Sequence, residues 1–265
     1  ARMNIQQAVN DFNANGYLII EDVINSAHID VLRNAMLADV EKILARTDTP
    51  FNFNKGNIQQ APPPFEPYLF EDVLFNETII DIAERILGGP VKNSFYSGNT
   101  ALPGDHTQPV HPDMPHPVAG GAFTPTSTIV VNIPVVDMSA TNGATQLWPT
   151  THLDTTYGGN VECIVKPHDL ERYRISHPPI QPNVKAGTVI LRDMRLWHAG
   201  MPNHTLNPRP MIAMMLWKTS AQTFGGIDVP ERSVPFFQGR RIETELVIKP
   251  DDGFNHIQHG ESYGV

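Results

Sequence analysis

Apolar residues follow a helical period up to about residue 90 and a strand-like pattern beyond it. Residues 4–15 carry apolar side chains at the i, i+3, i+4 and i+7 positions of an amphipathic helix, namely Ile5, Ala8, Val9 and Phe12. The same period predicts a helix from Ser26, which can cap it, to about Arg46, and another over Glu77–Leu87, which Gly88 ends. A short β-rich run, Tyr17–Ile20, lies between the first two helices.

Short β-rich runs separated by turns follow residue 90. They are residues 91–100, 108–113, 127–136, 144–148, 187–193, 196–199 and 209–219, with no helical pattern between them. Helices followed by seven strands predict an all-β core with flanking helices, as an antiparallel barrel or jelly roll. We expect a single domain over residues 1–265, with a helical part at 1–90, a core at 91–220 and a C-terminal wrap at 221–265 that holds one strand at 243–248.

Two stretches are candidates for an active-site lid. Residues 47–75 show little periodicity but interleave prolines with aromatic residues, among them Phe51, Phe53, Phe65 and Tyr68. Long irregular stretches in compact domains often cover functional sites, and the aromatic content favours packing over disorder. We expect residues 51–68, together with residues 224–237 of the tail, to close over a substrate.

Composition and charge narrow the class of partner. The formal charge of −9 argues against a nucleic-acid partner and slightly favours neutral or cationic small molecules. No apolar run approaches the ~20 residues of a membrane span, and no signal-peptide pattern follows Met3, so we expect a cytoplasmic protein without a membrane partner. Cys163 is the only cysteine, which excludes an internal disulfide and a cysteine-based zinc site; we expect it to be a small buried residue.

Three His-x-Asp pairs are candidates for metal binding. His28 and Asp30 fall on the second predicted helix, where positions i and i+2 point about 200° apart. His152 and Asp154 follow a Pro-Thr-Thr turn. His111 and Asp113 flank Pro112 in a predicted strand, and positions i and i+2 of a strand point to the same face.

Only the third pair has partners further along the chain. His198 lies on another predicted strand, and Arg209 follows it by eleven residues. Two histidines and one carboxylate make the facial triad of non-haem Fe(II) enzymes, which leaves coordination positions open. The planar fork of an arginine binds the far carboxylate of a dicarboxylate in a bidentate manner. These residues therefore fit a site that chelates 2-oxoglutarate to Fe(II).

The motifs over about residues 91–220 resemble the phytanoyl-CoA dioxygenase (PhyH) superfamily of Fe(II)/2-oxoglutarate-dependent oxygenases, most closely the branch of natural-product pathways. The matching stretches are Gln-Pro-Val-His-Pro-Asp at 108–113, Thr-Asn-Gly-Ala-Thr-Gln-Leu-Trp-Pro-Thr-Thr-His at 141–152, and His-Ala-Gly-Met-Pro-Asn-His-Thr at 198–205 leading to Arg209. The resemblance implies a double-stranded β-helix (jelly roll, cupin-like) and a role in secondary metabolism.

The resemblance also implies roles for single residues. His111, Asp113 and His198 would ligate the iron, and Arg209 would bind the distal carboxylate of 2-oxoglutarate. Gln108, Asn132 and, more weakly, Thr145 match positions that contact this cosubstrate. Two departures stand out: Gly200 replaces a serine or threonine that helps the arginine in many relatives, and Pro149-Thr150-Thr151-His152 replaces Pro-Gly-Ser-His.

Other polar and aromatic residues leave alternatives open. His106 and His116 could contact substrate or lie in a solvated loop. Trp148, Trp197 and Trp217 are expected in the core rather than at a substrate platform. Arg240 and Arg241 could meet an acidic substrate, but a solvated pair is favoured.

The chemistry implied is oxidation of a small organic molecule by O2, coupled to decarboxylation of 2-oxoglutarate to succinate and CO2. Hydroxylation is the default outcome, and desaturation, epoxidation or rearrangement would use the same residues. Halogenation is disfavoured, because related halogenases replace the carboxylate ligand by a small residue. The alternatives are a jelly-roll protein that binds a metal or sugar without turnover, and a Zn(II) or Fe(II) enzyme without 2-oxoglutarate; neither needs Arg209 beside Gln108.

Overall fold

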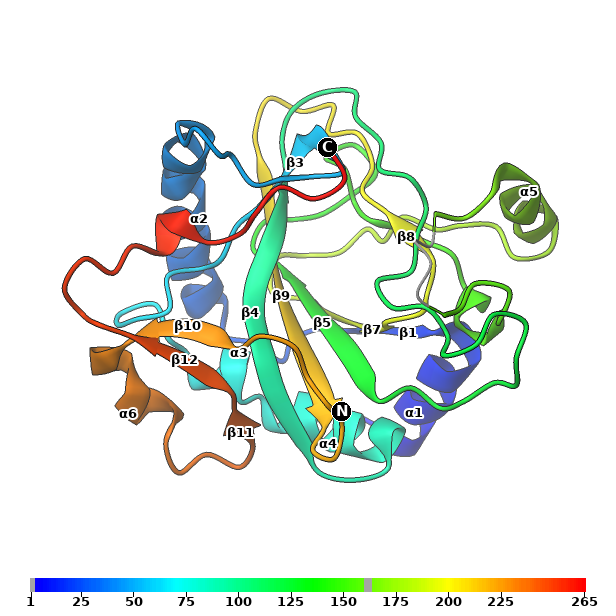
Figure 1. The fold of residues 1–265 in the computed structure, drawn as a ribbon, viewed down its shortest axis with the longest axis horizontal. Helices are drawn as coiled ribbons and strands as arrows, with labels where there is room; N and C mark the ends of the chain where they lie inside the picture. The colour runs from blue at the N-terminus through cyan, green and yellow to red at the C-terminus, as the bar shows by residue number, and fades with distance from the viewer. Residues whose placement is uncertain (1–2, 160–163) are drawn as a thin grey trace.

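The computed structural model describes residues 3–159 and 164–265, and its centre is a mixed sheet of eight strands. The order along this sheet is β1 (Tyr17–Ile20), β7 (Val189–Asp193), β5 (Thr128–Pro134), β9 (Arg209–Lys218), β4 (Val91–Ala101), β3 (Asn54–Gln59) and β2 (Phe51–Asn52). These pairs are antiparallel, and β11 (Glu243–Thr244) adds to β4 in parallel. Figure 1 shows β4, β9 and β5 side by side at the centre of the molecule.

Two short sheets complete the β-structure. One pairs β6 (Gln146–Leu147) with β8 (His198–Ala199), and the other pairs β10 (Ile227–Pro230) with β12 (Leu246–Lys249) in parallel. The first carries His198, whose backbone forms an isolated bridge with His111. The second lies beside the lower part of β4 (Figure 1).

The helices pack mainly on one face of the large sheet. They are α1 (Ile5–Asn15), α2 (Ser26–Leu44), α3 (Glu71–Leu74), α4 (Glu77–Leu87), α5 (Pro167–Ser176) and α6 (Val234–Phe237). The three long N-terminal helices, α1, α2 and α4, each begin after an asparagine whose side chain accepts a backbone N–H: Asn4, Asn25 and Asn76. Such caps satisfy donors that a helix start leaves free. The predicted cap Ser26 is therefore wrong by one residue.

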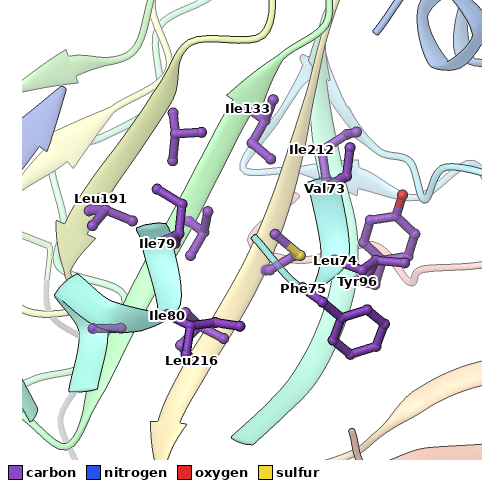
Figure 2. Packing of buried hydrophobic residues seen from close by; sticks show 14 of the residues in the cluster. Val73, Leu74, Phe75, Ile79, Ile80, Tyr96, Ile133, Leu191, Ile212 and Leu216 are labelled. Atoms are coloured by element: carbon purple, nitrogen blue, oxygen red, sulfur yellow. The ribbon is translucent and has the colours of Figure 1, made fainter. Parts of the chain in front are cut away.

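Isoleucines of α4 fill the core between helix and sheet. Ile79 and Ile80 pack against Leu191, Ile212 and Leu216, as Figure 2 shows. Full burial of one such side chain contributes about 1.5–3 kcal/mol. The alternate residues Met211, Ala213 and Met215 of β9 line a cavity instead, so the sheet separates the hydrophobic core from the candidate site.

Several predicted elements need correction. Residues 108–113 form no strand, because Pro109 and Pro112 lack the N–H groups of a ladder and only His111 makes a bridge. Residues 47–75 contain β2, β3 and α3 rather than an irregular lid alone, and the predicted strand at 243–248 is divided into β11 and β12. A helix, α5, interrupts the predicted run of strands.

The remaining predictions of secondary structure are confirmed at the level of element type. α4 has the predicted bounds, and the core strands agree within a few residues at their ends. Within the residues that the structure describes, no helix is long and apolar enough to span a membrane. Cys163 lies outside the described residues.

Candidate metal centre

His111, Asp113 and His198 come together at the bridge between the 108–113 segment and β8. One ligand atom from each lies within 4.8 Å of the others. Oδ1 of Asp113 is 3.4 Å from Nε2 of His198 and 4.0 Å from Nε2 of His111. Reciprocal backbone hydrogen bonds of 3.0 Å between the two histidines hold the cluster together. Two imidazole nitrogens and one carboxylate oxygen therefore face a common point.

The outward-facing ring nitrogens fix the orientation of both imidazoles. Nδ1 of His111 lies 2.7 Å from the carbonyl oxygen of Pro109, and Nδ1 of His198 lies 3.0 Å from that of Leu196. Donation from Nδ1 leaves the lone pair on Nε2 available to a metal. Burial, followed by the neighbouring His198, lowers the pKa of His111 to about 4, so this ring is neutral at pH 7. The ring of Phe53, 4.3 Å from that of His111, packs against it.

Arg192 is a member of the cluster that the sequence analysis missed. Its Nη2 lies 2.7 Å from Oδ2 of Asp113, which leaves Oδ1 facing the histidines. The side chain of Arg192 is 6% exposed and that of Asp113 is 28% exposed. Counted with its backbone, Asp113 is an exposed residue. Burial alone would raise the pKa of Asp113, but Arg192 and both histidines outweigh it and hold this pKa well below its usual value. An arginine inside the buried run Val-Ile-Leu-Arg-Asp was the available signal, because buried arginines are rare without a partner.

Arg209 lies at the start of β9 with its guanidinium buried. Nη2 donates to the carbonyl oxygen of Gly143 at 2.6 Å, while Nε and Nη1 find no partner among the described residues. Burial lowers its pKa to about 10, so it remains charged at pH 7. A buried cation with free donors is costly unless an anion pairs with it. Arg209 therefore fits the carboxylate of a bound small molecule.

Arg209 and the three clustered residues line the same cavity of about 320 Å³, called here the inner cavity. Gln108, Asn132 and Thr145, for which the resemblance implies contact with the cosubstrate, also line it. Oε1 of Gln108 accepts from the Gly200 N–H at 2.7 Å, and a Cβ at Gly200 would stand 2.7 Å from that oxygen. The glycine that departs from the family pattern thus makes room for Gln108.

The other two His-x-Asp pairs are not metal sites. His28 contacts Asp72 at 2.7 Å, while Asp30 pairs with Arg33. Nε2 of His152 lies 2.9 Å from the carbonyl oxygen of Asn13, and Asp154 binds Arg172 and Tyr173.

The remaining candidates divide between core, surface and cavity. The three tryptophans are buried as predicted, and His116 is buried against the His152 carbonyl rather than in a solvated loop. Arg241 is exposed, as the favoured interpretation of a solvated pair has it, whereas Arg240 is half-buried; both pair with acidic residues of α3 and α4. In the tail, Phe224 lines the inner cavity, but Phe236 and Phe237 pack on Phe75.

Comparisons with known proteins find one family model and several solved structures to which this chain is similar. The family model of phytanoyl-CoA dioxygenase (PhyH) matches residues 12–211. Dioxygenase af480 of Aspergillus fumigatus is 23% identical over 210 residues, which cover 77% of this chain but only 63% of that protein, less than two thirds of its length.

Solved structures show the same fold at low identity. AviO1 from Streptomyces viridochromogenes Tue57 is 20% identical, with 84% of this chain and 99% of that chain covered and a TM-score of 0.60. EctD from S. alaskensis, solved with 2-oxoglutarate and 5-hydroxyectoine, is also 20% identical, with 94% and 88% covered and a TM-score of 0.65. A second EctD structure, with bound Fe, is 19% identical with a TM-score of 0.64.

Proposed function

Because this chain belongs to the phytanoyl-CoA dioxygenase (PhyH) family, we propose that it is an Fe(II)/2-oxoglutarate-dependent oxygenase that oxidises a small organic molecule. The observation that supports this best is a single cavity that holds both a His-Asp-His cluster and a buried arginine with free donors. The position of this cavity between the large sheet and the β6–β8 pair supports a double-stranded β-helix within one domain.

His111, Asp113 and His198 would hold the iron. Three ligands from one side leave three coordination positions for cosubstrate, O2 and substrate. Bound Fe(II), with 2-oxoglutarate and O2, supplies the oxidising power for the substrate through decarboxylation of 2-oxoglutarate to succinate and CO2. The residues around it orient both imidazoles and hold one oxygen of Asp113 toward the metal position, and burial keeps the ring of His111 neutral.

Arg209 would bind the distal carboxylate of 2-oxoglutarate through its free Nε and Nη1. Gln108, Asn132 and Thr145 line the same space and would contact this cosubstrate. The apolar side chains of Val130, Met194 and Met215 line the cavity as well, which limits the water that can reach a reactive centre.

Hydroxylation is the outcome that we propose as default, in a pathway of secondary metabolism. Halogenation is disfavoured because Asp113 fills the third ligand position and is fixed by Arg192. A pure metal- or sugar-binding protein has no use for a buried arginine in the same cavity whose Nε and Nη1 have no partner among the described residues.

Succinate formation tests the proposal. The purified chain with Fe(II), O2 and 2-oxoglutarate should form succinate slowly even without substrate, and His198→Ala should abolish this. Ser233→Ala, which changes a buried residue that does not line the inner cavity, is the matched control and should leave the rate unchanged. No succinate from the unmodified chain, or equal rates from the chain and His198→Ala, would contradict the proposal.

A further inference from the structure

A second cavity adjoins the inner one. It has a volume of about 500 Å³ and lies between residues 94–96 of β4, residues 224–228 before and within β10, and residues 249–259 of the C-terminal segment. We call it the outer cavity. Phe95 and Phe224 line both cavities, so the two spaces meet at these rings.

The inner cavity leaves little room for a whole substrate. Its volume of about 320 Å³ is at the lower end of the range for small-molecule sites, roughly 300–1,000 Å³. Under the proposed function it also has to hold iron and 2-oxoglutarate. The part of a substrate remote from the oxidised carbon must therefore lie beyond it.

A gap in the pairing of β4 creates the outer cavity. β4 pairs with β3 through residues 99–101 and with β11 through Lys92 and Asn93, and Figure 1 shows these partners at opposite ends of the strand. Between them the register with β9 shifts at Ser94 and Phe95. A bulge of this kind redirects side chains, and here Phe95 comes to stand at the junction of the two cavities.

Ser94 and Tyr96 line the outer cavity, and each carries a buried hydroxyl group. Ser94 is 1% exposed and Tyr96 is 4% exposed, and neither hydroxyl has a hydrogen-bond partner within the described part of the chain. The ring of Tyr96 belongs to the hydrophobic cluster (Figure 2), and burial raises the pKa of its phenol, which therefore stays protonated. Both groups can donate a hydrogen bond to an oxygen acceptor.

The rest of the inner wall is mainly aromatic, with two histidines. His256 is already paired with Asp39, and burial lowers the pKa of His259, which keeps that ring neutral. Phe95, Phe224 and Phe254 contribute rings, whereas the charged side chains stand at the exposed rim, where Lys249 lies 3.7 Å from Asp228. Buried charge is costly without a partner, and apart from His256, which Asp39 already pairs, this wall offers an incoming charge none inside.

The C-terminal wall is held in place by buried contacts. Arg46 donates to the carbonyl oxygens of Ile257, His259 and Gly260. Nε2 of His256 lies 2.7 Å from Oδ2 of Asp39 on α2. The outer cavity is therefore bounded by the folded chain and not by a loose tail.

We propose that the outer cavity binds the part of the substrate remote from the oxidised carbon, and that it selects a neutral, elongated molecule with a planar apolar middle and a carbonyl or hydroxyl oxygen at its far end. The apolar middle packs between Phe95 and Phe224, and the oxygen accepts hydrogen bonds from Ser94 and Tyr96. This inference rests on the proposed function for its orientation toward the metal.

The test uses a neutral fluorescent bicyclic ketone, 6-propionyl-2-(dimethylamino)naphthalene, on the metal-free chain. It should bind with a blue-shifted emission. Ser94→Ala and Tyr96→Phe should each weaken binding about fivefold through one lost hydrogen bond, and Phe224→Ala should weaken it as well. Ser233→Ala is the matched control, because Ser233 is a buried hydroxyl without a partner among the described residues that lines neither cavity. It should leave the affinity unchanged.

Three results would overturn the proposal: no binding of the ketone, binding that all three cavity variants leave unaltered, or equally tight binding of the anionic probe 1-anilinonaphthalene-8-sulfonate. The measurement needs neither iron nor 2-oxoglutarate. Its failure is therefore distinguishable from failure of the proposed function, which succinate formation tests separately.

Discussion

Replacement of Arg192 by methionine tests the electrostatics of the metal centre. The Arg192 guanidinium lies 2.7 Å from Oδ2 of Asp113, with side chains 6% and 28% exposed. Removal of one partner of a buried ion pair costs about 3–5 kcal/mol. Because part of the Asp113 carboxylate is open to water, we expect Arg192→Met to lower the free energy of unfolding of the metal-free protein by about 3 kcal/mol, the lower end of this range.

A bound metal changes that expectation. The metal cation compensates the negative charge of the Asp113 carboxylate in place of Arg192. Arg192→Met should therefore destabilise the metal-loaded protein by only about 1 kcal/mol, as an ordinary substitution does. The difference of about 2 kcal/mol must appear as tighter metal binding, roughly 30-fold. The variant is thus expected to be less stable than the parent and yet to bind Fe(II) more tightly.

Urea unfolding with and without Fe(II) under anaerobic conditions measures both quantities. Arg195→Met is the matched control, because Arg195 forms a buried ion pair with Asp193 at 2.8 Å and does not line the inner cavity. It should destabilise both forms equally. Equal losses with and without metal in Arg192→Met, or weaker Fe(II) binding, would refute the reasoning.

Three further predictions follow from the same geometry. Arg209→Lys keeps the charge but loses the fork, so a lost charge-assisted bond of ~1.5–3 kcal/mol should weaken 2-oxoglutarate roughly 10- to 150-fold in a binding titration, with Fe(II) affinity nearly unchanged. Asp113→Ala should abolish succinate formation, whereas Asp30→Ala and Asp154→Ala should retain it and lose at most about 2 kcal/mol of stability; the opposite ranking would move the metal to another pair. Burial places the pKa of His111 at about 4 in the folded state against 6.5 ordinarily, so the unfolded chain takes up the proton first as pH falls. His111 should therefore contribute about 3 kcal/mol to the free energy of unfolding of the metal-free protein above pH 6.5, and this contribution should be lost as the pH falls from 6.5 to 4. Urea unfolding of His111→Gln over the same pH range should show a smaller loss of stability.

The helices and core strands were predictable because their hydrophobic periods are strong. Over Glu77–Leu87 the apolar positions, the capping asparagine and the final glycine all indicate the same helix, and the structure has these bounds. α5 was missed because its sequence has a weak period; Leu170 and Tyr173 pack beside Trp197, which only the fold brings near.

The pairing of strands through their backbones could not be predicted from the sequence either. β3, with the sequence Asn-Lys-Gly-Asn-Ile-Gln, has almost no strand pattern and forms because β4 offers it backbone partners. Residues 108–113 are the opposite case, a strand-like sequence that forms no strand. The prolines keep the chain extended, but they lack the N–H groups that pairing with a neighbouring strand needs. The convergence of His111 and Asp113 survives this error, because it needs extended geometry and not a sheet.

The sequence motifs predicted the main residues of the candidate site, but they did not predict the contacts that these residues make. His111, Asp113, His198 and Arg209 stand in recognisable order along the sequence, and the structure brings them to one cavity. Arg192 and the outer cavity depend on which strands lie beside each other and on a bulge in β4, which local patterns do not specify.

The most direct test of the central claim is anaerobic titration of 2-oxoglutarate into the chain with one equivalent of Fe(II), followed by visible absorption. If His111, Asp113 and His198 hold the iron in the cavity that Arg209 completes, chelation should produce a metal-to-ligand charge-transfer band that saturates at one 2-oxoglutarate per chain. The band should be weaker at one equivalent of Fe(II) in Asp113→Ala, which loses one of the three iron ligands, and require far more 2-oxoglutarate in Arg209→Lys. A chain that binds Fe(II) and 2-oxoglutarate without this band, or a band of equal strength in Asp113→Ala, would contradict the account.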